Sequence, residues 1–528
     1  MTPPPAAPTP SDRGDAERSA ARSSAPEVVI GLDLGTTAAK ATAYEVGGGR
    51  GAVAEREYPL LEPEPGWQVQ DPETMVEGAL GALREVVEQT PAGSVLALSC
   101  STAMHGLIGL DERMKPLTPL LTWADARASG IAQELLGTDE GHELHRRSGT
   151  PIHPMSPLTK LIWFERNDPD LFGRVRWWVG LKDYLLWRLT GELVTELSCA
   201  SGTGLLDLQA RDWSDETLRR IDVRRDQLPP VRPTTDSLGL GSSVAARIGL
   251  PSGTPVVLGA GDGPLGNLGT GALRPGVAGL SLGTSGALRT VVPEPGVDER
   301  CALFCYALTD QDWVVGGPVS NGGIVMRWAL DLVGQDLLRQ GSGSADAKLV
   351  ELAGSVPAGS EGLVMIPYLL AERAPLWDPS LPGSILGLRR HHTRGHLVRA
   401  AMEGVALQLA AIVDRLEELR PVTTVRATGG VFRAPLWGKV IGAVLDRPTY
   451  LMAASEGSSL GAAALGAYAI GRAPTLGTAL DLLSPGIMTA GEPVEVDPAD
   501  VETYARLRRS VPDLLEAQQR LAGAFTPR

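Results

Sequence analysis

The chain repeats one short pattern at two distant places, and this repeat constrains its fold more than any other feature. The pattern reads GLDLGTTAAKATAY from Gly31 and GLSLGTSGALRTVV from Gly279. Each copy consists of an apolar strand, a Leu-Gly-Thr-Thr/Ser turn and a returning strand, which together predict a hairpin. Copies this far apart indicate two similar domains, because solenoid repeats recur every ~20–50 residues. The sequence therefore predicts an α/β protein built from two related halves.

The segments outside the repeats predict further strands and a long helix. Residues 95–99 and 254–259 are short apolar runs, which is typical of buried strands. Residues 393–419 place apolar side chains at helical spacing with charges between them, which predicts an amphipathic helix. A short strand is expected over 422–427. Glycine and proline interrupt the pattern over 270–276, where we place the boundary between the halves.

The composition argues against several classes of protein. A formal net charge of −14 over 528 residues builds no basic surface for nucleic acid. It also gives no long-range attraction for an anionic substrate, so a local cluster would have to capture any anion. Four cysteines are too few for a disulfide scaffold. No stretch reaches the ~20 apolar residues of a membrane span. Residues 1–26 lack the apolar segment of a secretory signal and predict a disordered tail. We expect a cytoplasmic protein that binds neither nucleic acid nor membranes.

Both hairpin turns are candidate phosphate-binding sites. A glycine-rich turn with hydroxyl side chains offers backbone N–H groups and side-chain donors to phosphate oxygens. One Gly-Thr-Thr turn alone is only a good turn, but two copies, one in each half, could clamp phosphates across a cleft. Asp33 ends the first strand and could hold a metal ion. The candidate phosphate ligands are Gly35, Thr36, Thr37 and Lys40 of the first hairpin and Gly283, Thr284 and Ser285 of the second.

The loop GAGDGPLG, which begins at Gly259, matches the spacing of a dinucleotide-binding fingerprint. That fingerprint also needs an acidic residue about 20 positions later, and none is present there. Asp262 inside the loop would in addition repel a pyrophosphate. A carboxylate on a glycine-flanked turn is instead suited to act as general base on an alcohol. The alternative is that Asp262 only caps the following helix.

Two polar segments, residues 101–106 and 122–127, each follow an apolar run, and we treat them as one candidate group. It contains His105, Trp123, Asp125 and Arg127. Hydrogen-bonding groups beside an aromatic ring suit a polyhydroxylated substrate, although His105 taken alone is more often a structural histidine. The chain has no Gly-x-x-x-x-Gly-Lys-Ser/Thr loop, which excludes a P-loop kinase.

On these motifs the chain resembles the FGGY carbohydrate kinases from Val28 to about Met488. The resemblance implies two actin/RNase H-like domains, with ATP and a sugar in the cleft between them. It implies domains at 27–273 and 274–490 and a helical tail at 491–528. The catalytic Asp of the family corresponds to Asp262, and Mg²⁺ would lie near Asp33 and Asp262. Gly429 and Gly430 resemble the start of the signature that contacts the nucleotide.

Within that family, the substrate segments resemble the branch that phosphorylates gluconate. The matching segments are Ser101-Thr-Ala-Met-His105, the run Leu117–Asp125, and Gly149-Thr-Pro-Ile-His-Pro-Met-Ser-Pro157 followed by Lys160. The implied substrate ligands are Met104, His105, Trp123, Asp125, Arg127, Lys160 and Asp262. Lys160 and Arg127 are the candidates for the substrate carboxylate.

Alternatives of two kinds stay open. Xylulose kinases, and kinases for other sugars or polyols, carry similar segments. A non-catalytic, sugar-sensing ATPase of the actin-like superfamily would share the fold. The expected partners are a small sugar acid and ATP, and a homodimer is a further expectation.

Overall fold

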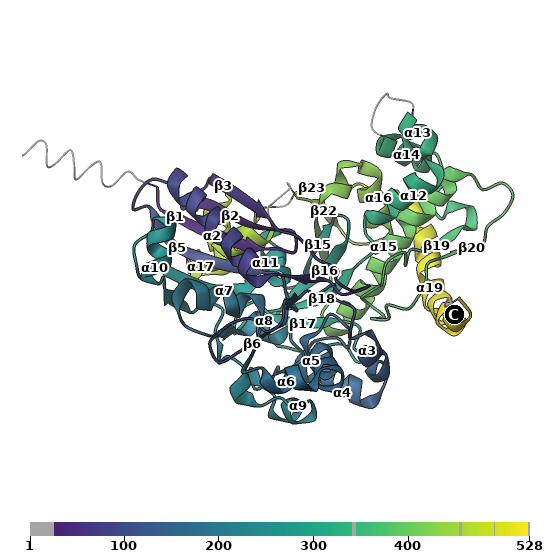
Figure 1. Cartoon of the computed structure of the whole chain (residues 1–528). Coiled ribbons are helices and arrows are strands. Elements are labelled where there is room, and N and C mark those ends of the chain that lie inside the picture. Colours follow the sequence, from purple (N-terminus) through teal and green to yellow (C-terminus); the bar gives the residue numbers. More distant parts are fainter. Residues whose placement is uncertain (1–25, 340–344, 453–456, 490, 526–528) are drawn as a thin grey trace, which may run out of the picture.

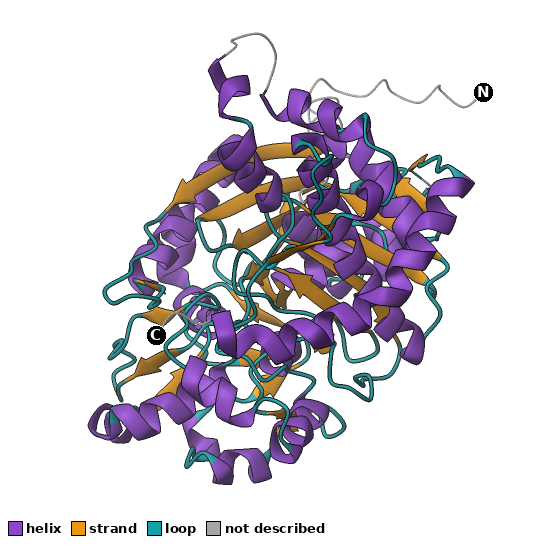
Figure 2. Cartoon of the chain, turned by 90° about the vertical axis from the view of Figure 1, so that its right-hand side faces the viewer, coloured by secondary structure: helices purple, strands orange, loops and turns teal. Residues whose placement is uncertain are grey.

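The computed structural model of the chain describes residues 26–339, 345–452, 457–489 and 491–525. Apart from residue 26, the tail predicted over residues 1–26 lies outside the described residues. The described chain forms two halves, each built around one sheet (Figure 1). Seen from the side, the strands of the sheets lie among helices that cover them (Figure 2).

The first half contains a six-stranded sheet with the order β13-β14-β5-β1-β2-β3. β1 pairs antiparallel with β2, and β2 with β3, because each pair is joined by a short turn. β5 and β14 run parallel to β1 and need longer crossover connections. The strands are β1 (Val28–Leu34), β2 (Ala38–Glu45), β3 (Arg50–Glu57), β5 (Val95–Thr102), β13 (Ser237–Gly239) and β14 (Pro255–Gly261).

The second half repeats this arrangement in a seven-stranded sheet with the order β17-β18-β16-β15-β21-β22-β23. β15 and β16 form the antiparallel hairpin, β16 pairs antiparallel with β18, and β21 and β22 follow in parallel. The order β18-β16-β15-β21-β22 therefore matches β3-β2-β1-β5-β14 of the first half. The strands are β15 (Val277–Leu282), β16 (Gly286–Val292), β17 (Phe304–Ala307), β18 (Trp313–Val319), β21 (Thr424–Thr428), β22 (Thr449–Leu451) and β23 (Glu492–Pro493). This matched order confirms the predicted α/β class with two RNase H-like halves.

Long helices cover the sheets. α2 (Pro72–Gln89) packs on β2 and β3, and the Asp71 side chain caps its first turn. α15 (Arg394–Leu419) is the predicted amphipathic helix. It is long and apolar enough to cross a membrane by length and composition alone, but 83% of its apolar window is buried inside the second half, as in a core helix. α19 (Pro498–Phe525) packs on α15 and α16 (Pro435–Leu445), so the chain ends against the second half.

Two helices connect the halves directly. α11 (Asp262–Gly269) follows β14, and α17 (Gly457–Ala469) follows β22 of the second sheet in sequence. α17 nevertheless packs on β1 and β5 of the first sheet and crosses α11. A side chain at Gly461 would lie 2.1 Å from the Leu265 carbonyl oxygen, and one at Gly31 would lie 2.1 Å from that of Ser459. Glycine at these positions is what permits backbone contact between the elements.

The segment between β5 and β14 carries additional helices beyond the core sheet. They form a lobe below the first sheet, where α4, α5, α6 and α9 lie (Figure 1). The short helix α8 (Leu197–Ser201) of this segment packs on β17 of the second half. The lobe therefore brings residues of the first half next to the second sheet. Besides α8, the helices of this segment are α3 (Ser129–Leu135), α4 (Asp139–Ser148), α5 (Pro157–Asn167), α6 (Pro169–Arg174), α7 (Leu181–Thr190), α9 (Asp215–Arg220) and α10 (Ser242–Ile248).

Candidate active site

Asp262 lies where β14 ends and α11 begins. Its Oδ1 accepts a hydrogen bond from the Gly263 N–H at 2.7 Å. Burial raises the pKa of its carboxyl to about 6, the Asp33 carboxylate adds to this shift, and Arg289 opposes it. Asp33 and Arg289 come from other elements, and a carboxylate that only caps a helix needs neither. Asp262 therefore has the surroundings of a base that is ionised at neutral pH but still able to take a proton.

Asp33 connects three segments at the end of β1. Its Oδ1 accepts a hydrogen bond from Ser101 Oγ of β5, and its Oδ2 accepts one from Ser458 Oγ of α17, both at 2.6 Å. The Asp33 carboxylate is thus fixed in position by hydroxyl groups and is not neutralised by a described cation. Within the described residues no group of three or more His, Cys, Asp and Glu gathers as a complete metal cage. Mg²⁺ does not need one, since one or two carboxylates with phosphate oxygens suffice.

Both segments that were predicted to carry phosphate-binding turns, β1–β2 and β15–β16, form hairpins in the structure. In the first, Gly35 N–H donates to the Ala38 carbonyl at 3.0 Å, and Thr37 is exposed at the tip. Lys40 is half-buried on β2, where it pairs with Asp33 in the strand register. Thr36 Oγ1 accepts a hydrogen bond from Trp123 Nε1 at 2.9 Å, which links this turn to the predicted sugar group.

The second hairpin turn is held by the helix that follows β18. Gly283 N–H donates to the Ser285 carbonyl at 2.8 Å, and the Gly283 carbonyl accepts from Gly323 N–H at 2.7 Å. The Thr284 and Ser285 side chains are exposed at the tip, as a phosphate-binding role requires. Both turns therefore present hydroxyl groups to the solvent at the ends of their hairpins.

A cavity of about 550 Å³ joins several of these groups. Asp262 and Gly263 line it from α11, Gly429 and Gly430 from the end of β21, and Ser458 from α17. Gly429 has φ = +123° and a Cβ there would lie 2.1 Å from the Leu282 carbonyl oxygen, so only glycine fits. The predicted nucleotide residues Gly429 and Gly430 thus share a cavity with Asp262. The residues of the two hairpin turns are not among those that line it.

His105 lies in the loop after β5, next to Met104, which contacts the strand end that carries Asp262. Its Nδ1–H donates to the Gly202 carbonyl at 2.7 Å, which leaves Nε2 as an acceptor, 3.5 Å from the Tyr306 hydroxyl. Burial lowers the pKa of His105 to about 3, so the imidazole is neutral. Met104, the preceding residue, is buried against Gly261, because a Cβ on Gly261 would lie 2.5 Å from the Met104 sulfur. Both predicted ligands therefore lie beside the strand end that carries Asp262.

Lys160 and Arg127, the residues predicted to receive the substrate carboxylate, both have protein partners in the structure. Lys160 is fully buried, and its Nζ donates to the carbonyls of His105 at 2.8 Å and Thr122 at 2.7 Å. Burial lowers the pKa of this ammonium to about 7. Arg127 forms a two-point ion pair with the buried Asp125, at 2.8 and 2.9 Å. The three side chains hold the loop around Trp123 in place, and their charged groups are already engaged by protein partners.

Three residues that the sequence did not single out complete the site: Arg289 of β16, Tyr306 of β17 and Arg373. Arg289 interacts electrostatically with Asp262, Tyr306 and Arg373. A Cβ on Gly263, next to Asp262, would lie 3.7 Å from Arg289 Nη2. The Arg373 guanidinium lies over the Trp123 ring, 5.2 Å from its centroid.

One feature of the sequence could have identified Arg289. It is a single charged residue in the apolar strand GALRTVV of the second repeat. A buried charge inside a strand is rare unless it has a partner or a function. Arg373 stands in an irregular loop with no periodicity to mark it, and no comparable signal could have identified it.

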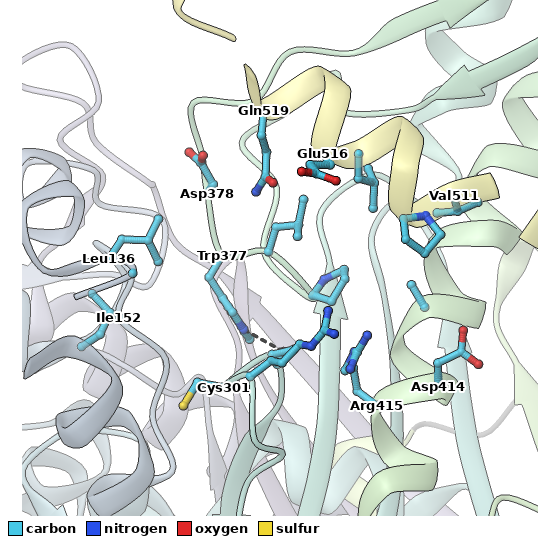
Figure 3. A pocket seen from close by; sticks show the side chains of 18 of the residues that line it. Leu136, Ile152, Cys301, Trp377, Asp378, Asp414, Arg415, Val511, Glu516 and Gln519 are labelled. Carbon is cyan, nitrogen blue, oxygen red and sulfur yellow. Dashed lines mark hydrogen bonds between the residues drawn. The ribbon is translucent and has the colours of Figure 1, made fainter. Parts of the chain in front are cut away.

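A second cavity, of about 510 Å³, lies between the two halves at a different place (Figure 3). Leu136 and Ile152 of the first half line one side, and Val511 and Glu516 of α19 line the other. The Trp377 indole N–H donates to the Ala302 carbonyl at 2.8 Å at its floor. None of the predicted site residues lines this cavity, so it is separate from the site around Asp262.

The fold and the site define a class of protein with two RNase H-like halves of the actin type and a half-buried aspartate in the cavity between them. Comparison with models of protein families gives a more specific assignment. Residues 28–269 match the N-terminal domain, and residues 278–470 the C-terminal domain, of the FGGY family of carbohydrate kinases. The chain belongs to this family, as its motifs predicted.

Individual relatives point to two substrates. A gluconokinase from Bacillus subtilis (strain 168) is 37% identical over 93% of this chain and 96% of its own length. The crystal structure of a gluconate kinase from Lactobacillus acidophilus has a TM-score of 0.87 and 32% identity, over 95% of this chain and 100% of that one. A ligand-bound xylulose kinase from the same organism has a TM-score of 0.88 and 31% identity over the same shares. The backbone fold therefore does not separate the two substrates.

Proposed function

We propose that the chain is a gluconokinase, which transfers the γ-phosphoryl group of ATP to the terminal hydroxyl of D-gluconate. The observation that carries this proposal is Asp262. It is a half-buried carboxylate with a pKa raised to about 6, between a phosphate-side cavity and a polar, sugar-side group of residues. A non-catalytic sugar sensor would not need a carboxylate whose pKa is raised in this way.

In the proposed reaction, Asp262 accepts the proton of the terminal hydroxyl. The hydroxyl oxygen then bonds to the γ-phosphorus, and the bond from that phosphorus to the β-phosphate bridging oxygen breaks, which releases ADP. Arg289 lies beside Asp262 and lines the same cavity, so its guanidinium is placed to offset charge on the transferring group. The Gly-Thr hairpins around Gly35 and Gly283 would orient the phosphates.

The proposal includes Mg²⁺ at Asp33 and Asp262. When bound, the ion would neutralise part of the phosphate charge. Ser101 and Ser458 hold the Asp33 carboxylate in a fixed orientation for this purpose. Asp33 raises the pKa of Asp262, as a neighbouring carboxylate does, and this interaction supports a shared ion. A cytoplasmic location and a homodimer stay predictions.

Gluconate is preferred to xylulose for two reasons. The gluconokinase relative is more similar and covers more of the chain than a xylulose kinase of the same bacterium, which is 30% identical over 84% of this chain. The site also contains two arginines in a protein of net charge −14. A local positive cluster of this kind suits an anionic substrate better than a neutral ketose.

The test of Asp262 is the substitution Asp262→Asn, which keeps the size of the side chain but removes the base. We expect kcat with D-gluconate to fall by about two to four decades, the usual size of a general-base contribution. Coupled ADP release measures kcat, and calorimetric binding of ATP checks that the nucleotide site is intact. Asp170→Asn, in the exposed first turn of α6, is the matched control and should behave as wild type. Near-normal turnover of Asp262→Asn would remove Asp262 from the mechanism.

A further inference from the structure

Two site arginines, Arg289 and Arg373, form no ion pair at contact distance with any described residue, although Asp262 acts on both electrostatically. Arg127 pairs with Asp125 and Arg399 pairs with Glu403, as buried guanidinium groups usually do. Among the described residues, neither Arg289 nor Arg373 forms an ion pair with a carboxylate, and the buried Arg289 Nε has no hydrogen-bond partner. Unpaired cations at a partly desolvated site indicate anionic ligands. The proposed reaction brings two anionic groups to this place, the γ-phosphate of ATP and the acid group of the substrate.

Arg289 and Arg373 are placed for different anions. Arg289 lines the cavity that contains Asp262, Gly429 and Gly430, on the phosphate side. Arg373 lies over Trp123, and its charge acts on His105 and on His153. These residues belong to the sugar-side group. The charge of Arg373 also acts on Asp262, but Arg373 does not line the phosphate-side cavity, whereas Arg289 does. We therefore assign Arg289 to the transferring phosphoryl group and Arg373 to the part of the substrate over Trp123.

Hydrogen bonds to neutral oxygens orient the Arg373 guanidinium, and the adjacent Glu372 carboxylate acts on it electrostatically without forming an ion pair with it. Nε donates to Ser320 Oγ and Nη2 donates to the Val319 carbonyl, both at 3.1 Å. The neighbouring Glu372 carboxylate is occupied by other donors, the Ser320 N–H at 2.8 Å and the Asn321 side-chain amide at 2.7 Å. No described residue accepts a hydrogen bond from Arg373 Nη1. The guanidinium is thus held by neutral oxygens, with donors left over for a ligand.

We propose that Arg373, stacked on Trp123, binds the carboxylate of the sugar acid and makes the site select acids over neutral sugars. This inference rests on the proposed kinase function and names the group that recognises its substrate. A carboxylate would complete the ion pair that Arg373 lacks within the protein. A neutral polyol could form the same hydrogen bonds through its hydroxyl groups, but it would leave the Arg373 guanidinium without an anionic partner. Arg373 is a substrate-binding residue and takes no part in the proton transfer.

The test compares two acceptors that differ only at one end. D-Glucitol has the carbon chain and hydroxyl pattern of D-gluconate, with a CH₂OH group in place of the carboxylate. Arg373→Gln should lower kcat/KM for gluconate by about 10- to 100-fold, the range of one charge-assisted hydrogen bond, mainly through KM. The Kd of glucitol and the KM of ATP should change less than about threefold. The preference for gluconate over glucitol should therefore collapse.

The control is Arg176→Gln. Arg176 also lies over a tryptophan, 4.1 Å from the Trp177 ring centroid, but away from the site residues. It should leave the preference between gluconate and glucitol unchanged. Arg373→Lys keeps the charge but not the planar fork, and should retain part of the preference. It also carries the test if Arg373→Gln does not fold.

Three results would overturn the assignment. One is an equal loss of affinity for gluconate and glucitol, which indicates a structural role. Another is an effect confined to the KM of ATP. The third is a selective loss with Arg289→Gln while Arg373→Gln keeps the preference. The outcomes separate this inference from the proposed function. A wild-type enzyme that does not phosphorylate gluconate contradicts the function, whereas an active wild type with an Arg373→Gln variant that still prefers gluconate contradicts only the role of Arg373.

Discussion

At the scale of single residues, the balance of charges around Asp262 decides the pH at which the enzyme works. Burial and the Asp33 carboxylate raise the pKa of Asp262 to about 6, while Arg289 holds it down. Only the ionised carboxylate can accept a proton, so activity depends on deprotonation of this group. The wild-type kcat/KM should therefore fall as the pH drops below about 6.

Removal of the Arg289 charge should shift the acid limb of the pH profile, which is the range in which kcat/KM falls as the pH drops. Arg289→Gln takes away the group that lowers the pKa of Asp262, so the pKa rises and the limb shifts to higher pH. Profiles of kcat/KM for gluconate between pH 5 and 9 would measure the shift, and the substrate carboxylate stays ionised over this range. Arg176→Gln should keep the wild-type profile. A limb that stays in place, or moves to lower pH, in Arg289→Gln would show that Asp262 is not the group that titrates.

At the scale of secondary structure, the crossing of α11 and α17 holds the site together. Ser458, which fixes Asp33, and Gly461, which contacts the Leu265 backbone, lie one turn apart on α17. Gly461→Ala would place a methyl group 2.1 Å from the Leu265 carbonyl oxygen and force the helices apart. Such overpacking costs about 1–3 kcal/mol. We expect a lower apparent Tm and a higher KM for ATP, since Ser458 moves with the helix.

Thermal scans and ATP kinetics would measure both effects. Gly173→Ala is the control, because a Cβ at Gly173 of α6 would have no atom within 4 Å. Equal behaviour of the two variants would mean that the crossing tolerates a side chain and does not control the position of Ser458.

The same elements show what could be predicted from the sequence. The strands of both hairpins were predicted to within a few residues, because an apolar run that ends at a Gly-Thr turn has few other structures available. The packing of α17 on the first sheet could not be predicted. Its sequence, GSSLGAAALGAYA, has small residues on every side and no distinct polar face, so no pattern indicates its partner.

At the scale of the whole molecule, the site depends on both halves. Asp33 and Asp262 come from the first half, whereas Arg289 and Arg373 come from the second. The two aspartates could be predicted because each follows a strand at a recognisable turn. The pairing of Lys160 and Arg127 with protein groups depends on packing within the first half, and the placement of Arg373 over Trp123 depends on how the halves meet. Local sequence encodes neither arrangement. The negative net charge of the chain predicts a local cation cluster for an anionic substrate, but the sequence did not single out Arg289 and Arg373 as its members.

The most direct test of the account is acceptor-dependent ADP release with Mg-ATP. The acceptors are D-gluconate, D-xylulose, glycerol and L-ribulose, with a reaction without acceptor as the blank. We predict that D-gluconate gives the highest kcat/KM and that ATP turnover is negligible without an acceptor. Turnover on xylulose or glycerol alone would contradict the gluconate assignment and leave a kinase for a neutral substrate. ATP hydrolysis that is independent of any acceptor would contradict the kinase itself.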